Sequence, residues 1–500
     1  MAIGGFRLSE AAIVLIEKYR AIPQTRTSRM SVSPLANLLK TVAHKEPEEH
    51  QPDHHETSSA IVPPVPETVE ESGIPASMLE HLILKLLYTR GEMLGRDLSE
   101  AMGLKFSLIE DFLEYLKHQH LIQAKTSMGM GNSTTLFALT ETGRDHAREC
   151  MEHNQYAGPA PVPLFQYSYI VRRQKQREGW LTPDGLAHAY RRMVVTPRIL
   201  SQIGPAVSSG NSFLIYGQPG NGKTFLAEAL GNLDESPIYI PHAIECQGQI
   251  VQVFDPVYHQ AIEDEAPSVM LSAVQEPYDR RWVKCRRPFI VTGGELTLDM
   301  LELKYNSTSK IYDAPYQLKA NNGIYLIDDF GRQLCTPAEV LNRWIVPMER
   351  RVDFLKFTGG GKMTVPFEAF LVFSTNLKPD QLGDEAFLRR IQYKMFLRSP
   401  DQSEFATIFQ KYCEARNLAC DESLLAGFIE MHYLRTARPF RRCHPRDVIS
   451  HAIDLIHFER LKFELSDDLL NRAFESCFLE DDGSDAEMGA TMAKRRDLGK

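Results

Sequence analysis

Residues 213–225 combine an apolar run, three glycines, a lysine and a hydroxyl group in an order that suits phosphate binding. The spacing G-x-x-x-x-G-K-[ST] lies between a strand-like and a helix-like segment and is met by Gly217, Gly222, Lys223 and Thr224. Backbone N–H groups approach a polyphosphate closely only where no Cβ atom intervenes, and a helix N-terminus supplies further donors. The pattern therefore predicts a phosphate-binding loop made of Gly217, Gln218, Pro219, Gly220, Asn221, Gly222, Lys223, Thr224 and Phe225.

Two consecutive carboxylates follow a second apolar run, residues 323–327. A buried parallel strand ends at the edge of the sheet where open α/β folds bind ligands, so Asp328 and Asp329 are expected beside the phosphate loop. Lys223 is then expected to contact the β- and γ-phosphates of ATP, while the Thr224 hydroxyl and Asp328 hold Mg²⁺. Asp329 is expected to orient and deprotonate the attacking water.

Polar side chains that suit phosphoryl transfer also occur further along the chain. Asn376 ends the apolar run 370–375 and is expected to polarise the same water. Arg389 and Arg390 end a predicted helix, and Arg446 begins another. Guanidinium groups directed at the γ-phosphate stabilise the charge that develops during hydrolysis. Taken alone, each arginine motif is equally compatible with a structural or solvated role.

Length and composition indicate a globular protein of two to four domains, with 500 residues, a formal net charge of −9 and a pI near 6.0. That charge gives no global attraction to nucleic acid or anionic membranes. The eight cysteines include no C-x-x-C pair, which favours reduced thiols and a cytoplasmic location. No apolar run is long enough to predict a transmembrane helix, so no membrane partner is expected.

The pattern of residues 74–150 resembles a winged helix-turn-helix domain, with predicted helices over 77–88, 95–102 and 107–120 and a wing tip at 129–132. The resemblance implies DNA binding through the third helix. However, residues 76–150 hold eight Lys and Arg against ten Asp and Glu, and the third helix carries Glu110, Asp111 and Glu114. Phosphate contacts supply much of the affinity for DNA, so we favour a protein-binding or dimerising domain and keep a DNA reader as the alternative.

In this order, the motifs of residues 181–478 resemble those of the AAA+ ATPases. The phosphate loop is similar to Walker A, Asp328 and Asp329 to Walker B, Asn376 to sensor 1 and Arg446 to sensor 2. The resemblance implies a homo-oligomeric ring, commonly a hexamer, in which Arg389 or Arg390 completes the neighbouring site. It also implies that Arg446 acts from a helical lid. The sequence departs from the family at Asp329, where glutamate is usual, and this shorter side chain would slow turnover.

A helix over 341–351 followed by strands at 352–357 and 363–366 predicts a hairpin before the Asn376 strand. This hairpin is similar to the pre-sensor-1 insertion of the MoxR, magnesium-chelatase and enhancer-binding activator branches. The long interval between Thr224 and Asp328 is expected to carry a second hairpin or loop, including the acidic stretch 263–267. Three aromatic residues are interpreted either as substrate-facing or as core: Trp282, Tyr312 and Tyr316.

The predicted fold class is α/β, with a P-loop core of parallel strands, a helical lid and a preceding winged helix-turn-helix domain. The predicted domains are 1–73 (N-terminal helix and disordered linker), 74–150 (winged helix), 151–180 (connector), 181–399 (nucleotide-binding), 400–479 (lid) and 480–500 (disordered tail). The predicted function is Mg²⁺-dependent ATP hydrolysis in a ring that remodels an unknown protein client. The alternatives are a DNA-binding transcriptional regulator whose assembly ATP controls, and a switch that binds ATP without turnover.

Overall fold

The computed structural model describes residues 61–127, 131–176, 180–191, 193–263, 278–383 and 388–478. All of them belong to one of two units, the one that spans Ala60–Lys500. The predicted N-terminal helix and tail 480–500 lie outside the described residues, as do most of the predicted linker, two of the four wing-tip residues and most of the acidic stretch 263–267. No helix in the described ranges has the length and hydrophobicity that a bilayer crossing requires.

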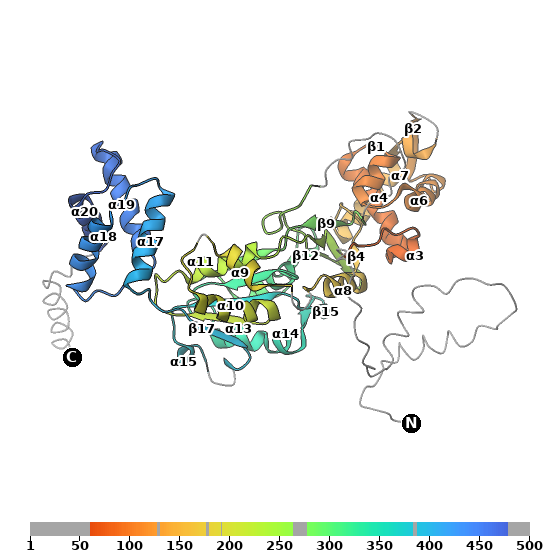
Figure 1. The fold of residues 1–500 in the computed structure, drawn as a ribbon. Helices are drawn as coiled ribbons and strands as arrows, with labels where there is room; N and C mark the ends of the chain where they lie inside the picture. Colours follow the sequence, from red (N-terminus) through yellow and green to blue (C-terminus); the bar gives the residue numbers. More distant parts are fainter. Residues whose placement is uncertain are drawn as a thin grey trace, which may run out of the picture. The chain divides into compact units, whose positions relative to one another are not determined.

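The first described elements are helices packed on a small antiparallel sheet (Figure 1). The helices are α3 (Val69–Ser72), α4 (Ala76–Arg90), α5 (Gly95–Met102), α6 (Phe106–His118) and α7 (Glu141–His153). The strands β1 (Met93–Leu94), β2 (Ile122–Ser127) and β3 (Thr135–Leu139) pair in the order β1-β3-β2. The predicted helices over 77–88, 95–102 and 107–120 are confirmed with ends within two residues. Assignment to the winged-helix class stays a prediction.

Five parallel strands form the central sheet. Their order is β10-β13-β16-β5-β17, and their bounds are β5 (Phe213–Tyr216), β10 (Phe289–Thr292), β13 (Ile324–Ile327), β16 (Phe370–Thr375) and β17 (Tyr393–Phe396). The predicted α/β class with a parallel sheet is therefore confirmed. Because β13, β16 and β5 are adjacent, the segments that follow them emerge side by side at one edge of the sheet.

Alternate side chains of these apolar strands enter two separate hydrophobic cores, one on each face of the sheet. Leu214, Tyr325 and Phe373 belong to one core. Ile215, Leu326 and Val372 belong to the other. Helices that contribute to these cores are α9 (Pro183–Ala189), α10 (Pro197–Ser209), α11 (Lys223–Glu228), α13 (Pro337–Arg343) and α14 (Ile345–Arg350). Burial on both faces explains why the strands read as continuous apolar runs rather than alternating ones.

The segment between Thr224 and Asp328 holds most of a second five-stranded sheet, which is more than the single extra hairpin or loop that the sequence predicts. Its strands, in the order β11-β12-β8-β7-β4, are β4 (Val162–Pro163), β7 (Ala243–Cys246), β8 (Gln249–Gln252), β11 (Lys304–Asn306) and β12 (Ile311–Asp313). A two-stranded pair, β6 (Ile238–Pro241) and β9 (Trp282–Cys285), and helix α8 (Leu164–Arg173) share its core. Trp282 and Tyr312 are buried there, which favours their interpretation as core residues.

The predicted hairpin before the Asn376 strand is confirmed. Strands β14 (Val352–Lys356) and β15 (Lys362–Pro366) pair antiparallel over five residues each. The helix predicted over 341–351 is present but broken at one residue, because α13 ends at Arg343 and α14 begins at Ile345. Pro347 has no N–H to donate to the Arg343 carbonyl, which interrupts the helix at Trp344, and the fully buried Trp344 packs against Tyr325, Phe367 and Phe373.

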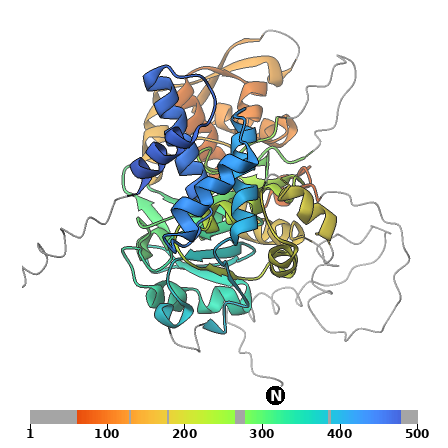
Figure 2. The same cartoon turned by 60° about the vertical axis from the view of Figure 1, so that its left-hand side comes forward.

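The last described elements form a helical bundle that Figure 2 shows from a second direction. They are α17 (Gln402–Ala415), α18 (Glu422–Ile429), the π-helical turn η4 (Glu430–Leu434), α19 (His444–Glu459) and α20 (Asp467–Cys477). Asp401, Asp421 and Ser466 cap three of these helices with side-chain hydrogen bonds. An aromatic cluster that includes Phe405 and Tyr433 fills the bundle.

A buried ion pair joins the two-stranded pair β6–β9 to the elements around it. The Arg281 guanidinium lies 2.8 Å from Asp279 Oδ2, with side-chain exposures of 1% and 2%. Arg281 also donates to the carbonyl of Ser72 and to Gln166 Oε1. Its charge therefore ties α3 and α8 to the loop that precedes β9.

Replacing Asp279 with asparagine leaves the Arg281 charge buried without its counter-ion. We expect Asp279→Asn to lower the free energy of unfolding by about 3–5 kcal/mol. A urea titration followed by tryptophan fluorescence measures this, because Trp282 stacks on Tyr167 within the same core. The exposed pair Arg96–Asp97 supplies the control, since Asp97→Asn should cost less than about 1 kcal/mol. Equal, small effects of both substitutions would contradict this account.

Candidate nucleotide-binding site

The predicted phosphate-binding and catalytic residues of three adjacent strands lie at one edge of the central sheet. The phosphate loop follows β5, Asp328 and Asp329 follow β13, and Asn376 follows β16. The loop then enters α11 at Lys223, so the first N–H groups of this helix lie at the same edge. The topology brings together residues that are up to about 150 positions apart in the chain, as in the Lys223–Asn376 contact.

Lys223 is the most tightly held of these residues, with its side chain 5% exposed. Its ammonium donates to the carbonyl oxygens of Gly217 and Gln218, both at 3.1 Å, and to Asn376 Oδ1 at 2.6 Å. Burial lowers the pKa of Lys223, while the charges of Asp329 and Asp328 act in the opposite direction. The structure thus holds the ammonium within the loop, where a phosphate oxygen could replace a carbonyl as its acceptor.

The two carboxylates make different contacts. Thr224 Oγ1 donates to Asp328 Oδ2 at 2.8 Å, and Asn376 Nδ2 donates to Asp329 Oδ1 at 2.8 Å. Asp329 is exposed and has a positive φ of 48°, which is uncommon outside glycine. Gln333 stabilises this turn by donating to the carbonyl oxygens of both aspartates. Asn376 therefore links the lysine to Asp329, while Thr224 and Asp328 form a separate pair.

Glycine is required at two loop positions for different reasons. A Cβ at Gly217 would lie 2.4 Å from the carbonyl oxygen of Leu397 in the chain after β17. Gly220 has φ 77°, and a Cβ there would lie 2.7 Å from Cys443 Sγ of the helical bundle. Both contacts are close approaches of neighbouring segments, so the loop is fixed from two sides.

A cavity of about 760 Å³ opens along the loop and reaches the helical bundle. This volume lies within the range of about 300–1,000 Å³ that is usual for small-molecule sites. One end carries Lys223, Thr224 and the two aspartates. The other end is largely apolar and is lined by Met193, Val194, Val195, Ile199, Leu397 and Ile408. A polar end beside an apolar one suits a molecule with phosphates at one end and a base at the other.

The apolar end is the part of the site that sequence reasoning missed. Residues 182–207 read in the sequence as a single helical segment, but the structure divides them: α9 ends at Ala189 and α10 begins only at Pro197. The intervening chain places Val194 and Val195 in the cavity wall. Thr196 and Pro197 could have indicated this break in the sequence, because threonine at the N-cap and proline at the first helical position mark a helix start.

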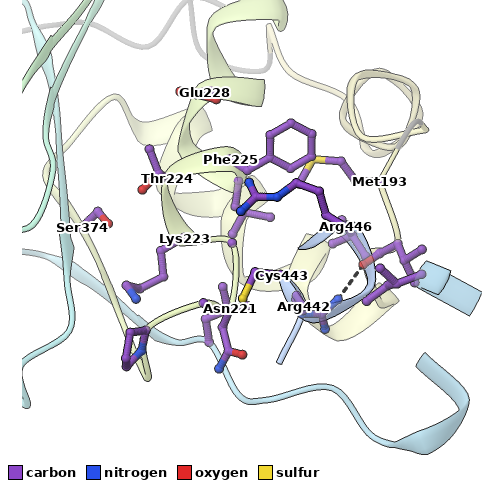
Figure 3. Close-up of a pocket in the computed structure, with 18 of the residues that line it drawn as sticks. Met193, Asn221, Lys223, Thr224, Phe225, Glu228, Ser374, Arg442, Cys443 and Arg446 are labelled. Atoms are coloured by element: carbon purple, nitrogen blue, oxygen red, sulfur yellow. Dashed lines mark hydrogen bonds between the residues drawn. The ribbon is translucent and has the colours of Figure 1, made fainter. Parts of the chain in front are cut away.

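The helical bundle contributes a second group of side chains to the cavity, including Lys411, Tyr412, Arg442, Cys443 and Arg446. The backbone N–H of Cys443 donates to the carbonyl of Gly220 at 2.9 Å, and Arg442 donates to the carbonyl of Val194 at 2.9 Å. Figure 3 shows Arg446 beside Phe225, near Met193. Arg446 also pairs with Asp447 at 2.8 Å and remains 60% exposed.

The other two predicted arginines lie away from this cavity. Neither Arg389 nor Arg390 is among its lining residues. Arg390 Nε donates to Glu349 Oε1 of α14 at 2.9 Å, and Arg389 is exposed. In a single chain, these two residues therefore do not join Lys223, Asp328, Asp329 and Asn376.

Two features of the site fit a nucleotide with its Mg²⁺ ion. Asn221 is 1% exposed and its Oδ1 has no hydrogen-bond partner among the described atoms, so the loop carries an unsatisfied polar group. Thr224 and Asp328 offer a hydroxyl and a carboxylate 2.8 Å apart. These are the hard oxygen ligands that Mg²⁺ prefers, and Mg²⁺ typically takes few protein ligands beside phosphate and water. Thr224 and Asp328 would hold the ion, which would shield the phosphate charge.

Part of the chain is similar to known proteins. A domain of unknown function (DUF8689) matches residues 401–476, which span α17 to α20 except for Cys477. No curated protein matches the chain. The solved structure of NtrX from Brucella abortus is similar at 11% identity and a TM-score of 0.36, covering 63% of this chain and 65% of that one. The chain thus spans a little less than two thirds of that protein.

Two further solved structures are similar to this chain at comparable levels. NtrX from Brucella abortus in complex with ATP shows 12% identity and a TM-score of 0.34, covering 72% of this chain and 68% of that one. Domain III of the replication initiation protein DnaA from Thermotoga maritima shows 15% identity and a TM-score of 0.31, covering 60% and 99%.

The Thr224–Asp328 pair gives a specific expectation for metal dependence. Thr224→Val keeps the shape of the side chain but removes the hydroxyl that would complete the ion's ligands. We expect the Mg²⁺ concentration at half-maximal nucleotide binding to rise about tenfold, the effect of losing about 1.4 kcal/mol. A Mg²⁺ titration with a fluorescent ATP analogue measures it. Thr407→Val, on the exposed surface of α17, is the control, and an unchanged Mg²⁺ requirement in Thr224→Val would refute the assignment.

Proposed function

We propose that the chain is a Mg²⁺-dependent ATPase of the AAA+ class that works in a ring of its own copies. The observation that carries this proposal is the Asn376 amide, which accepts from Lys223 and donates to Asp329. These hydrogen bonds join three side chains at one edge of the sheet. Lys223 would bind phosphate, Asp329 would accept a proton and Asn376 would orient the water. Few arrangements other than phosphoryl transfer need all three together.

The roles of the residues follow from these contacts. Lys223 exchanges its carbonyl acceptors for phosphate oxygens, and the N–H groups at the start of α11 donate to the same anion. Asp329 accepts the proton of the attacking water, and Asn376 holds that carboxylate in position. Arg446 approaches the nucleotide from the helical bundle, where it stabilises the charge of the phosphates.

The ring is proposed because one chain does not complete the site. Of the two candidate arginines, Arg390 is bonded to Glu349 of its own chain, whereas Arg389 is exposed. Arg389 is therefore the better candidate to reach the γ-phosphate bound by a neighbouring copy. A head-to-tail contact forms a ring when the rotation between copies closes, and a hexamer is the ring that we propose.

The partner that this ATPase remodels is proposed to be a protein recruited through residues 1–150. Helix α6 supports a protein over DNA, because Glu110 and Glu114 both accept a hydrogen bond from Asn132, the last residue of the predicted wing tip. Two carboxylates thus occupy the surface where a DNA reader would present positive charge. The full chain is expected not to shift a DNA duplex even at low salt, and a salt-dependent shift would favour the DNA-binding alternative.

Asp329→Asn tests the proposed general base. The amide cannot accept the proton, so phosphate release should fall by at least about a hundredfold while ATP still binds. A coupled assay for inorganic phosphate measures turnover, and Asp468→Asn, on the surface of α20, is the matched control. Equal and near-zero rates in wild type and Asp329→Asn would instead identify a switch that binds ATP without hydrolysis.

Mixing two inactive variants tests the arginine and the ring together. Arg389→Ala keeps its own site but lacks the arginine, while Asp329→Asn keeps the arginine but lacks the base. In a mixed ring about one quarter of the contacts combine an intact site with an intact arginine, so activity should return to roughly that fraction of wild type. If Arg390→Ala is instead inactive alone and recovers in the same mixture, while Arg389→Ala is active alone, the role belongs to Arg390. No recovery with either variant would contradict catalysis between subunits.

A further inference from the structure

Three side chains with metal-binding atoms meet at the interface between α4 and α7, in a domain that contributes nothing to the nucleotide cavity. They are His81 of α4, and His146 and Cys150 of α7. One ligand atom from each lies within 4.8 Å of the other two. His146 and Cys150 are four residues apart, so they share one face of the helix.

The burial of the three residues suits an ion that reaches its site from solvent. Cys150 is buried, His81 is partly buried and His146 is exposed. A buried thiol at the base and an exposed imidazole at the rim leave one side open to water. The cluster therefore has a protein-covered side and an accessible side.

The donor types indicate which ions fit. Imidazole nitrogen and thiolate sulfur are ligands of Zn²⁺ and of related transition metals, whereas Mg²⁺ requires oxygen. Three protein ligands and one open position are typical of zinc sites that keep a bound water. The ion proposed here is thus chemically distinct from the Mg²⁺ of the nucleotide site.

Neighbouring groups provide the outer contacts that such sites use. Glu149 Oε2 lies 3.4 Å from His146 Nδ1, and a carboxylate on a ring nitrogen orients metal-binding histidines. Lys85 is 4% exposed, donates to Asn154 Oδ1 at 2.7 Å and interacts electrostatically with Cys150. The positive charge of Lys85 opposes a nearby cation. Burial raises the pKa of the Cys150 thiol and the Lys85 charge lowers it only in part, so an ion that binds the thiolate displaces its proton.

We propose that His81, His146 and Cys150 bind one Zn²⁺-class ion, with water as the fourth ligand. Ligand atoms around a tetrahedral zinc ion lie about 3.5 Å apart, so the three side chains must approach by about 1 Å or slightly more. Rotation of His146 at the exposed rim brings its ring toward the other two. The bound ion fastens α4 to α7 and stabilises the N-terminal domain, because it binds the folded state and finds no such site in the unfolded chain.

Cobalt provides the probe, because Co²⁺ bound to a thiolate shows a sulfur-to-metal charge-transfer band that nitrogen and oxygen ligands alone do not give. The purified full-length chain, freed of metal with a chelator and kept reduced without nucleotide, is titrated with Co²⁺. The proposal predicts a charge-transfer band that saturates at one equivalent and is displaced by Zn²⁺. It also predicts that Zn²⁺ raises the melting temperature.

Four variants separate this site from others. Cys150→Ser and His146→Gln should lose the band and the Zn²⁺-dependent rise in melting temperature. His146 is exposed, so this second variant should fold even if Cys150→Ser does not. His118→Gln, at the exposed end of α6, and Cys443→Ser, beside the phosphate loop, should keep both signals. Absence of the band in wild type, or its persistence in a folded Cys150→Ser or His146→Gln protein, would overturn the proposal.

Discussion

The hydrogen bonds of Asn376 with Lys223 and Asp329 are the interactions on which the rest of the site depends. They exist only because β13, β16 and β5 are neighbours in a parallel sheet, which brings three chain segments to one edge. The sheet holds this order because alternate side chains of each strand fill two opposed cores. Burying Lys223 costs free energy, and its three acceptors offset that cost. Core packing thus determines where the charged residues meet.

A second constraint lies where the helical bundle meets the cavity. Glu404, 9% exposed, accepts from Arg398 and from Arg442, both at 3.0 Å, and Arg442 also donates to Val194. Charge-assisted bonds at such a buried position are strong, and removing one partner leaves another charge uncompensated. Cys443 adds a backbone bond to Gly220 of the phosphate loop. Movement of the bundle must break these contacts, so they couple its position to the cavity along the predicted phosphate loop.

Local patterns predicted the loop, the two carboxylates and the hairpin, because each depends on residues that are close in the chain. The position of Asn376 beside the loop was predictable because it directly follows an apolar strand, and parallel strands share one ligand-binding edge. Long-range packing decided what the sequence could not show. Thr196 and Pro197 mark the start of α10, but only packing places Val194 and Val195 in the cavity wall. The cluster of His81, His146 and Cys150 joins positions more than sixty residues apart, so no spacing within one helix indicates all three.

The central claim is that Lys223 and the strand-end residues around it bind a triphosphate. Calorimetric titration of the full-length protein with ATP in the presence of Mg²⁺ tests it most directly. The account predicts one ATP bound per chain and loss of that binding in Lys223→Met, while Lys356→Met, on the exposed hairpin, binds as wild type does. Absence of ATP binding by the wild type at millimolar concentrations, or equal binding by Lys223→Met, would contradict it.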